Sequence, residues 1–434
     1  MRAEDLRPAR TGASAPPGRR IPAGPGCART DDLTNKGETR MADTSAPLIE
    51  RIFEPVVDTH DTWGVLNPMQ GCVAQCGYCY LKDLGLTGTR PVELATPTEA
   101  VRLLLAHPHY RRDKPYALYT CTDALATPTN REHLTGLLRA LVAEQVRNPV
   151  CIITKFHVPD DVIGEIYAAR AAGLPVVVYL SYSGLGRDVE KGVHHGRLRD
   201  NFPRLHAARI PVVHYWRPAL PQNSDPESMA WMLDWAARWA ECSVTVGLKV
   251  KPGARQQAVD LWPALADPGL DLHSAEAIWP APARDFFADI PERYAHHPIY
   301  ETNSCALAYV LGRADRANVH GTPTCTDANR CPVGQRGRCM VELAVRAPLT
   351  EGELRAELVR SGLGHLPYTW DASSRALTLD GPVEMRDQHH LAQALTVTVR
   401  APRADAEAMW SGKAAGGRLL VIPTTTGREP LCES

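Results

Sequence analysis

Residues 71–80, GCVAQCGYCY, place Cys72, Cys76 and Cys79 within eight residues at the spacing C-x3-C-x2-C. A loop of this kind wraps one corner of a [4Fe–4S] cube and binds three of its four irons, which leaves the fourth iron open to a substrate or cofactor. A structural zinc site is the alternative, but it wants a fourth ligand nearby and usually two short C-x2-C hooks. The spacing therefore favours an iron–sulfur cluster with an open iron over a zinc ion.

The sequence around this loop alternates between strand-like and helix-like patterns. From about residue 60 to residue 270, short β-branched or aromatic runs are separated by segments with helical periodicity, which is typical of βα units and a parallel sheet. The runs predict six strands, at Thr62–Asn67, Tyr116–Cys121, Val150–Thr154, Pro175–Ser181, Ile210–Trp216 and Ser243–Val250. A helix is predicted between the second and third strands.

That helix has both a start signal and an apolar face. Thr129 and Glu132 are spaced as a capping box, which predicts that the helix begins there. Apolar residues then recur on one face, at Leu134, Leu137, Leu138, Leu141 and Val142.

Polar residues follow four of the predicted strands where each strand ends. Thr122 and Asp123 follow the second strand, Lys155 follows the third, Ser181 ends the fourth and Arg217 ends the fifth. Because the carboxyl ends of parallel strands meet at one edge of a sheet, these side chains should converge on one mouth. Taken singly, each has a plainer explanation as a strand-end cap, and Arg217 has one as part of a surface ion pair.

Four short motifs resemble one family. Asn67-Pro68 precedes the cysteine loop, Tyr78-Cys79-Tyr80 lies within it, and Cys121-Thr122-Asp123 and Thr154-Lys155-Phe156-His157 lie at the ends of the second and third strands. With the cysteine spacing, they resemble the radical S-adenosylmethionine (SAM) superfamily and, over about residues 60–255, its spore photoproduct lyase branch. The resemblance implies an α/β fold, an incomplete (β/α)6 TIM-like barrel with its chemistry at the C-terminal ends of the strands.

The same resemblance implies a reaction and its cofactors. A [4Fe–4S] cluster with an open iron would bind SAM, and one electron from the cluster would cleave it to a 5′-deoxyadenosyl radical that abstracts a hydrogen atom from an organic substrate. A flavodoxin- or ferredoxin-type reductant would supply the electron. Thr122 and Asp123 would lie near the methionine amino group of SAM, Lys155 near its carboxylate, and Ser181 near the ribose or the carboxylate.

Three further residues take roles from the resemblance. Tyr78 fills the aromatic position before the third cysteine, and Arg217 would contact the cofactor or a substrate anion. Cys121 would point its thiol toward the mouth and give a hydrogen atom to a product radical, because an S–H bond is weaker than most C–H bonds. The family has one more residue before the position of Asp123, and the alternative is that Cys121 is a small buried hydrophobe.

A second group of cysteines lies beyond the predicted barrel, at Cys305, Cys325, Cys331 and Cys339. Their spacing is absent from the lyase pattern, and it matches neither the usual auxiliary-cluster domains nor a two-hook zinc ribbon. Four cysteines can supply all the protein ligands of a zinc ion or an iron–sulfur cluster and leave no open position. We therefore expect an auxiliary [4Fe–4S] cluster here, with zinc and unrelated thiols as the alternatives.

The chain divides into four expected parts. Residues 1–45 carry almost no aliphatic periodicity and are expected to be disordered, with translation starting at Met41; a transit sequence is the alternative. Residues 46–270 should form the partial barrel and residues 271–346 a cysteine-rich extension that binds metal. Residues 347–434 should form a small α+β module of helix, hairpin and helix with a flexible tail.

Charge and composition narrow the function further. A formal net charge of −1 gives no whole-chain field for tight nucleic-acid binding. No apolar run approaches the roughly 20 residues of a membrane-spanning helix, and no signal peptide is evident, so we expect a cytoplasmic protein without membrane partners. The expected substrate is a natural product, nucleoside or peptide. The alternatives are a lyase-like DNA repair enzyme and a non-catalytic iron–sulfur or zinc protein that binds nucleic acid.

Overall fold

The computed structural model of the chain describes residues 46–49, 52–250, 254–272, 275–288, 290–315, 331–402, 404 and 418–422. The expected disorder of residues 1–45 and the start at Met41 lie outside these ranges. So do Cys325 and most of the expected flexible tail.

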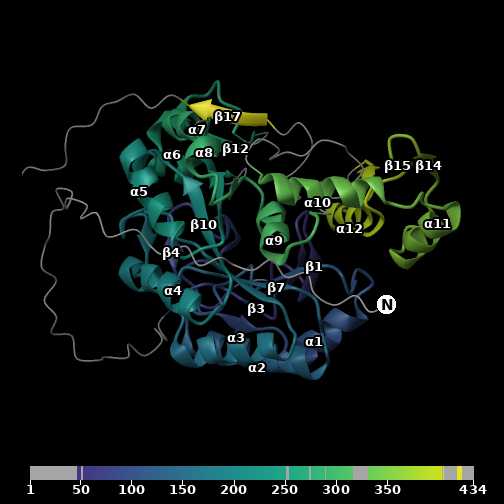
Figure 1. The fold of residues 1–434 in the computed structure, drawn as a ribbon, viewed down its shortest axis with the longest axis horizontal. Helices are drawn as coiled ribbons and strands as arrows, with labels where there is room; N and C mark the ends of the chain where they lie inside the picture. Colours follow the sequence, from purple (N-terminus) through teal and green to yellow (C-terminus); the bar gives the residue numbers. More distant parts are fainter. Residues whose placement is uncertain are drawn as a thin grey trace, which may run out of the picture. The chain divides into compact units, whose positions relative to one another are not determined.

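One eight-stranded sheet organises the fold, in the order β1-β2-β6-β7-β8-β10-β11-β13 (Figure 1). β1 pairs antiparallel with β2, and every later neighbouring pair is parallel. The order of the strands in the sheet is their order in the chain, as successive βα units require. The strands are β1 (Val57–Thr59), β2 (Gly64–Leu66), β6 (Tyr116–Leu118), β7 (Val150–Thr154), β8 (Val176–Leu180), β10 (Val212–Ala219), β11 (Cys242–Gly247) and β13 (Ile299–Tyr300).

The predicted α/β class with a parallel sheet is confirmed. All six predicted strands lie in this sheet, and β7 has the predicted bounds Val150–Thr154. The sequence did not predict β1 or β13, which are three and two residues long and too short to show an alternating pattern.

Successive residues along the strands face two separate cores, as strand geometry requires. Leu118 and Ile152 pack in one core with residues of seven helices, five of which precede β11 in the chain. Ala117 and Cys151 pack on the other face with helix α9 (Asn303–Leu311), which lies apart from α2 and α3 in Figure 1. Both faces of the sheet are therefore covered. The five helices are α1 (Pro97–Ala106), α2 (Pro128–Ala143), α3 (Asp160–Ala171), α4 (His195–Ala207) and α5 (Pro226–Ala236).

Helix α2 begins earlier than its predicted capping box. Thr127 is the N-cap, and its hydroxyl accepts a hydrogen bond from Asn130 N at 3.1 Å. Pro128 fills the first helical position, where the missing N–H costs nothing. The prediction of Thr129 and Glu132 as the cap is therefore wrong. The apolar face is confirmed, because four of its leucines are fully buried: Leu134, Leu137, Leu138 and Leu141.

Short elements complete the described part of the chain. β3 (Met69–Gln70) pairs with β5 (Val92–Glu93), and β4 (Gln75–Cys76) pairs with β9 (Glu190–Lys191), both antiparallel. The other elements are α6 (Arg255–Leu261), β12 (Ala275–Pro280), α7 (Ala281–Ala288), α8 (Ile290–Arg293), α10 (Val333–Ala344) and β17 (Arg418–Ile422), which pairs with β12. None of the described helices has the length and apolar character needed to cross a membrane.

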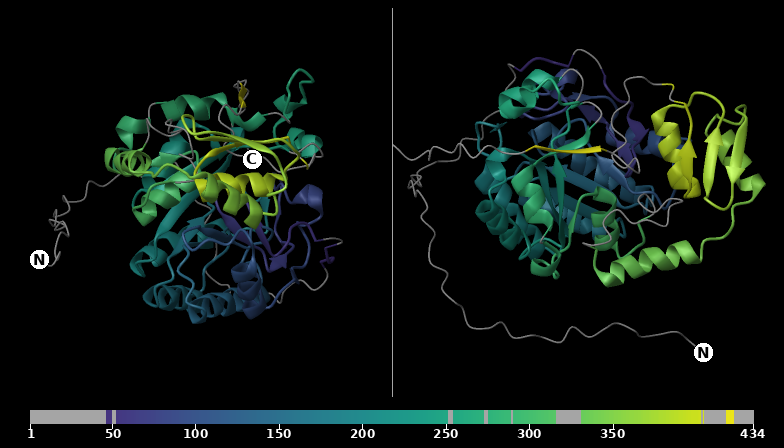
Figure 2. Two further views of the ribbon diagram at one scale, coloured as in Figure 1. Left: turned by 90° about the vertical axis from the view of Figure 1, so that its right-hand side faces the viewer. Right: turned by 90° about the horizontal axis from the view of Figure 1, so that it is seen from above.

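The C-terminal region contains the helix, hairpin and helix that the sequence predicts. These are α11 (Glu351–Arg360), the antiparallel strands β14 (Tyr368–Asp371) and β15 (Ala376–Leu379), and α12 (Met385–Leu395). An unpredicted strand, β16 (Thr398–Arg400), pairs parallel with β15. These elements share one hydrophobic core and stand together in the right-hand view of Figure 2.

A buried polar layer joins α12 to the sheet. His109 Nε2 lies 3.0 Å from a carboxylate oxygen of Asp387, and the His109 and His390 rings stack with their centroids 4.1 Å apart. Beneath them, the buried Lys114 donates a hydrogen bond to Thr59 Oγ1 at 3.1 Å. Lys114 is therefore a buried amine in this layer, and the charge of Asp58 is the largest effect that favours its protonated form.

Lys114 should make the stability of the chain depend on pH. Burial lowers its pKa from 10.5 to about 7, so between these values the folded chain binds fewer protons at Lys114 than the unfolded chain, and stability rises with pH. Below pH 7 Lys114 is protonated in the folded chain as well, so the full free-energy cost of burying its charge lowers the stability. We expect Lys114→Met to raise the free energy of unfolding at pH 6 by about 1 kcal/mol or more, and by less at pH 9, as measured by chemical denaturation. An equal effect at both pH values would contradict the low pKa.

Candidate active site

The cysteine loop is held by backbone hydrogen bonds at several points. Cys72 forms a bridge with Thr87, and its N–H donates to Leu86 O at 2.7 Å. Cys76 lies in β4, and Cys79 N donates to Cys76 O at 3.1 Å, which closes a tight turn between these two cysteines. Cys72 and Cys76 are buried and Cys79 is half-buried. The loop thus gathers its thiols with little access for water.

The three thiols fit a positively charged metal centre. Burial raises the pKa of Cys72 well above its ordinary value and that of Cys76 to about 12, and Cys79 raises both further. A bound cation reverses this cost, because the thiolate is the metal ligand.

The chain that follows β6 is bonded directly to the cysteine loop. The Thr122 hydroxyl donates to Gly71 O, and Gly71 N donates to Cys121 O at 3.1 Å. Asn130 of α2 donates to the Thr122 hydroxyl at 3.3 Å. Thr122 therefore anchors the loop, and its predicted contact with the cofactor amino group stays a prediction.

Asp123 links the end of β6 to the end of β7. Its Oδ1 accepts hydrogen bonds from Leu125 N at 2.9 Å and from the Thr154 hydroxyl at 2.8 Å, and its Oδ2 accepts from Lys155 N at 2.7 Å. Burial raises the pKa of Asp123, and these three bonds oppose that rise. The carboxylate fixes the backbone of Lys155, while its predicted contact with SAM stays a prediction.

Lys155 lies over the cysteine loop. Its ammonium group donates to Ser181 O at 2.9 Å and to Glu190 Oε1 at 2.8 Å, and it lies 5.5 Å from the centroid of the Tyr78 ring. The Lys155 charge also lowers the pKa of Cys76, against the larger effect of burial. The structure thus places Lys155 against the Ser181 backbone and near the Tyr78 ring, while the predicted contacts of Lys155 and Ser181 with SAM stay predictions.

Glu190 is a candidate site residue that sequence reasoning missed. It is fully buried, and its Oε1 accepts hydrogen bonds from the Tyr78 hydroxyl, from Lys155 and, at 2.7 Å, from the Ser183 hydroxyl. Its strand, β9, is two residues long in a polar stretch that reads as a loop. Its pairing with Cys76 in the β4–β9 ladder becomes visible only in the folded chain.

Arg217 lies beside the cysteine loop. Its guanidinium donates to the Tyr215 hydroxyl and lies 5.2 Å from the centroid of that ring. The Arg217 charge lowers the pKa of Cys79 against the larger effect of burial. Arg217 lies within β10 and not at the predicted end of the strand, because β10 continues to Ala219. Its charge and that of Lys155, which follows β7, both lower the pKa of Cys79.

Cys121 is almost fully buried, with 1% of its surface exposed. It packs with Leu81 and Leu86 in a small apolar cluster that borders Cys79. Its thiol donates to Glu54 Oε2 at 3.4 Å, and burial followed by the Glu54 charge raises its pKa well above the ordinary value. The thiol therefore stays protonated, which is the form that a hydrogen-atom donor needs.

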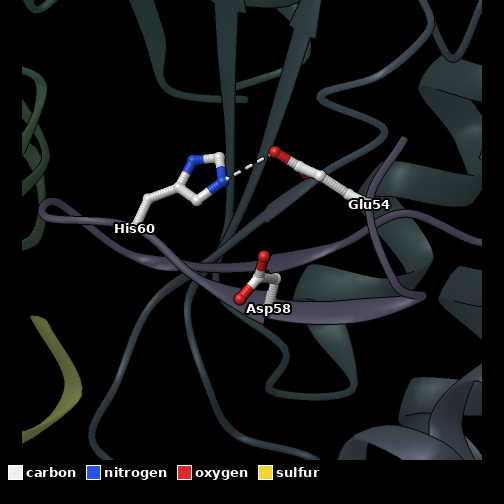
Figure 3. A group of neighbouring side chains, drawn as sticks. All are labelled: Glu54, Asp58 and His60. Carbon is white, nitrogen blue, oxygen red and sulfur yellow. Dashed lines mark hydrogen bonds and ion pairs between the residues drawn. The ribbon is translucent and has the colours of Figure 1, made fainter. Parts of the chain in front are cut away.

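Glu54 also belongs to a group with Asp58 and His60 whose ligand-type atoms lie within 4.8 Å of one another (Figure 3). Its Oε1 lies 3.2 Å from His60 Nε2, and its Oε2 accepts a hydrogen bond from Asn67 Nδ2 at 2.8 Å as well as the thiol of Cys121. Hydrogen bonds already use both oxygens of Glu54, so we interpret this group as support for Cys121 and not as a metal site.

Two described members of the second cysteine group, Cys305 and Cys339, form hydrogen bonds with Asp315. Cys305 Sγ donates to Asp315 Oδ2 at 3.2 Å, and Asp315 N donates to Cys339 Sγ at 3.4 Å. Cys331 Sγ lies 3.8 Å from the Tyr300 hydroxyl. Asp315 is buried and was not predicted, while Cys325 lies outside the described residues.

This second group lies near the amino ends of the parallel strands, whereas the cysteine loop lies near their carboxyl ends. A cavity of about 590 Å³ is lined by Ser304 and Asp315 together with Pro115 and Pro149, which immediately precede β6 and β7. The cysteine loop is bonded instead to Thr122, beyond the end of β6. The two groups therefore do not share one mouth.

Comparison with known proteins yields structural neighbours only. No protein-family model and no curated protein matches the chain. The fold is similar to that of spore photoproduct lyase complexed with dinucleoside spore photoproduct, at 12% identity, 55% coverage of this chain, 76% of that chain and a TM-score of 0.41. It is also similar to Streptococcus suis SuiB bound to S-adenosylmethionine (11% identity, 48% of each chain, TM-score 0.35). The chain spans less than half the length of SuiB.

Proposed function

We propose that the chain is a radical SAM enzyme with its active site at the carboxyl ends of β6, β7, β8 and β10, in a partial barrel. The observation that carries this proposal is the convergence of three thiols, two of them buried and one half-buried, with charged groups from separate strands. Lys155 and Arg217 place positive charge near Cys76 and Cys79 and lower the pKa of these thiols, whereas the Asp123 carboxylate raises the pKa of Cys72. Thiol ligands with cations near them suit an iron–sulfur cluster, whose ligands are thiolates.

Cys72, Cys76 and Cys79 would hold a [4Fe–4S] cluster by three irons. A cluster of this kind supplies the electron that cleaves SAM to a 5′-deoxyadenosyl radical. The chain itself contributes position and shielding: backbone bonds fix the loop, and burial of the thiols excludes water from the centre.

Lys155 would orient the cofactor. An ammonium group has three N–H donors, and Ser181 O and Glu190 Oε1 take two of them. The remaining donor is available to the carboxylate of SAM, at a position that Asp123 fixes through the backbone of Lys155. Arg217 would contact the cofactor or an anionic group of the substrate.

The proposed substrate is a natural product, nucleoside or peptide, and a flavodoxin- or ferredoxin-type protein would deliver the electron. The test uses anaerobically reconstituted, reduced protein incubated with SAM, with 5′-deoxyadenosine measured by chromatography and the cluster signal by EPR. We expect 5′-deoxyadenosine to form and the EPR signal to change when SAM is added. An EPR signal that does not change when SAM is added, together with no cleavage of SAM, would overturn the proposal.

A second metal centre is part of the proposal. Cys305, Cys331 and Cys339, with Cys325, would bind an auxiliary [4Fe–4S] cluster, with zinc as the alternative. The buried Asp315 touches two of these cysteines and adds an oxygen donor to the set. Its place at the far edge of the sheet supports a structural or electron-carrying role more than contact with the substrate.

Cys121→Ala should separate cofactor cleavage from product formation. The thiol is protonated and borders the loop, so we expect both metal centres and SAM cleavage to persist while product is diverted to adducts or uncoupled 5′-deoxyadenosine. Product analysis by mass spectrometry checks this, with Cys242→Ala as a control for loss of a buried thiol elsewhere. An unchanged product distribution would reject the donor role.

A further inference from the structure

Glu190 occupies a central place beside the cysteine loop. Its strand β9 pairs antiparallel with β4, and Glu190 stands in register with Cys76. Gly77 N also donates to Val189 O at 2.8 Å, so the backbone on both sides of the pairing is fixed. The position of Glu190 is therefore coupled to the position of the loop that carries the thiols.

One oxygen of this carboxylate gathers donors from three segments. Oε1 accepts hydrogen bonds from Tyr78 in the loop, from Lys155 after β7 at 2.8 Å and from Ser183 after β8 at 2.7 Å. Glu190 has no exposed surface, and the side chain of Lys155 is 15% exposed. A buried carboxylate is retained at low cost only when it is paired, and Lys155 provides that pairing.

The other oxygen lies against His195. Glu190 Oε2 is 3.5 Å from His195 Nδ1, and neither atom makes a hydrogen bond within the described structure. Burial lowers the pKa of His195, so the ring faces the carboxylate in its neutral form near pH 7. The charge of Glu190 is thus balanced by Lys155 and not by His195.

We propose that Glu190 is a positioning residue for the SAM site: it holds Lys155 and Tyr78 so that the free donor of Lys155 meets the cofactor carboxylate beside the cysteine loop. The inference rests on the proposed function. Glu190 acts through Lys155, because it fixes one of the three N–H donors while Ser181 O fixes another. A residue that only supported the fold would not affect cofactor affinity through the lysine.

The test compares Glu190→Gln with the wild-type holoprotein. The amide keeps the size of the side chain and removes its charge. Iron content measures cluster retention, and SAM affinity is taken from the titrated change in the EPR signal. We expect Glu190→Gln to keep its cluster and to bind SAM about tenfold more weakly, because hydrogen bonds between charged groups are the strong ones. Lys191→Gln, at the adjacent exposed position, is the matched control and should bind as the wild type does.

A double variant decides whether Glu190 works through Lys155. If it does, Lys155→Met with Glu190→Gln should bind SAM no more weakly than Lys155→Met alone, since contacts within one network are not additive. Wild-type affinity in Glu190→Gln, or full additivity in the double variant, would overturn the inference. If the wild-type protein itself shows no response to SAM, the proposed function fails, and that result is distinct from either.

Discussion

Replacing Cys72, Cys76 or Cys79 by Ala is expected to abolish SAM cleavage. Each supplies one of the three protein ligands of the proposed cluster, and no other cysteine of the described chain lies within the loop to replace it. The iron of the first centre, about four per chain for a cubane, should fall sharply. Elemental analysis and assay of 5′-deoxyadenosine after anaerobic reconstitution measure both effects.

Cys151→Ala is the matched control for this result. Cys151 is a fully buried cysteine within β7, and it packs in the core shared with α9, on the face away from the helices that follow the strands. Its loss should leave iron content and cleavage near wild-type values. Full cleavage activity in any of the three loop variants would contradict the proposed cluster.

The triple variant lacking Cys72, Cys76 and Cys79 is expected to retain metal. The second group lies at the opposite edge of the sheet, so its centre should assemble independently and hold about four irons of the roughly eight per chain expected for two cubanes. Iron and zinc analysis of the purified triple variant measures this directly.

The metal found in that variant separates the alternatives. Retained iron supports the auxiliary cluster, retained zinc supports a structural zinc site, and absence of both would show that these cysteines are unrelated thiols. Adding Cys305→Ser should remove the retained metal, because Cys305 contacts Asp315 inside the group. Metal that survives this change would place its binding site elsewhere.

Parts of the candidate site could be predicted because they follow from local pattern and strand order. β7 is a continuous apolar run, Val150–Thr154, so both its bounds and the place of Lys155 beyond its end are visible in the sequence. The convergence of strand ends then follows from parallel topology alone. No conformational detail is needed for this step.

Other parts could not be predicted because their partners come from distant segments. Glu190 meets Tyr78 across 112 positions of sequence, and Glu54 meets Cys121 across 67. Each lies in or beside elements too short to have a periodic pattern. Their roles arise from pairings that form only when the sheet and the loop are assembled. The start of α2 was missed for a smaller reason, because Thr127 with Pro128 outcompetes Thr129 as a cap.

The covering of both sheet faces limits how a substrate can arrive. Helices α1 to α5 pack on one face and α9 on the other, against Tyr179 and Tyr215 among others. Cys72 and Cys76 belong to the core on the side of α1 to α5, and Thr122, which follows β6, bonds to the loop that carries them. For the proposed reaction, a long polymer would not reach the thiols through the sheet, because the described residues pack both of its faces. It would have to present a chain end, a protruding side group or an extruded base at the rim, whereas a small metabolite could enter whole.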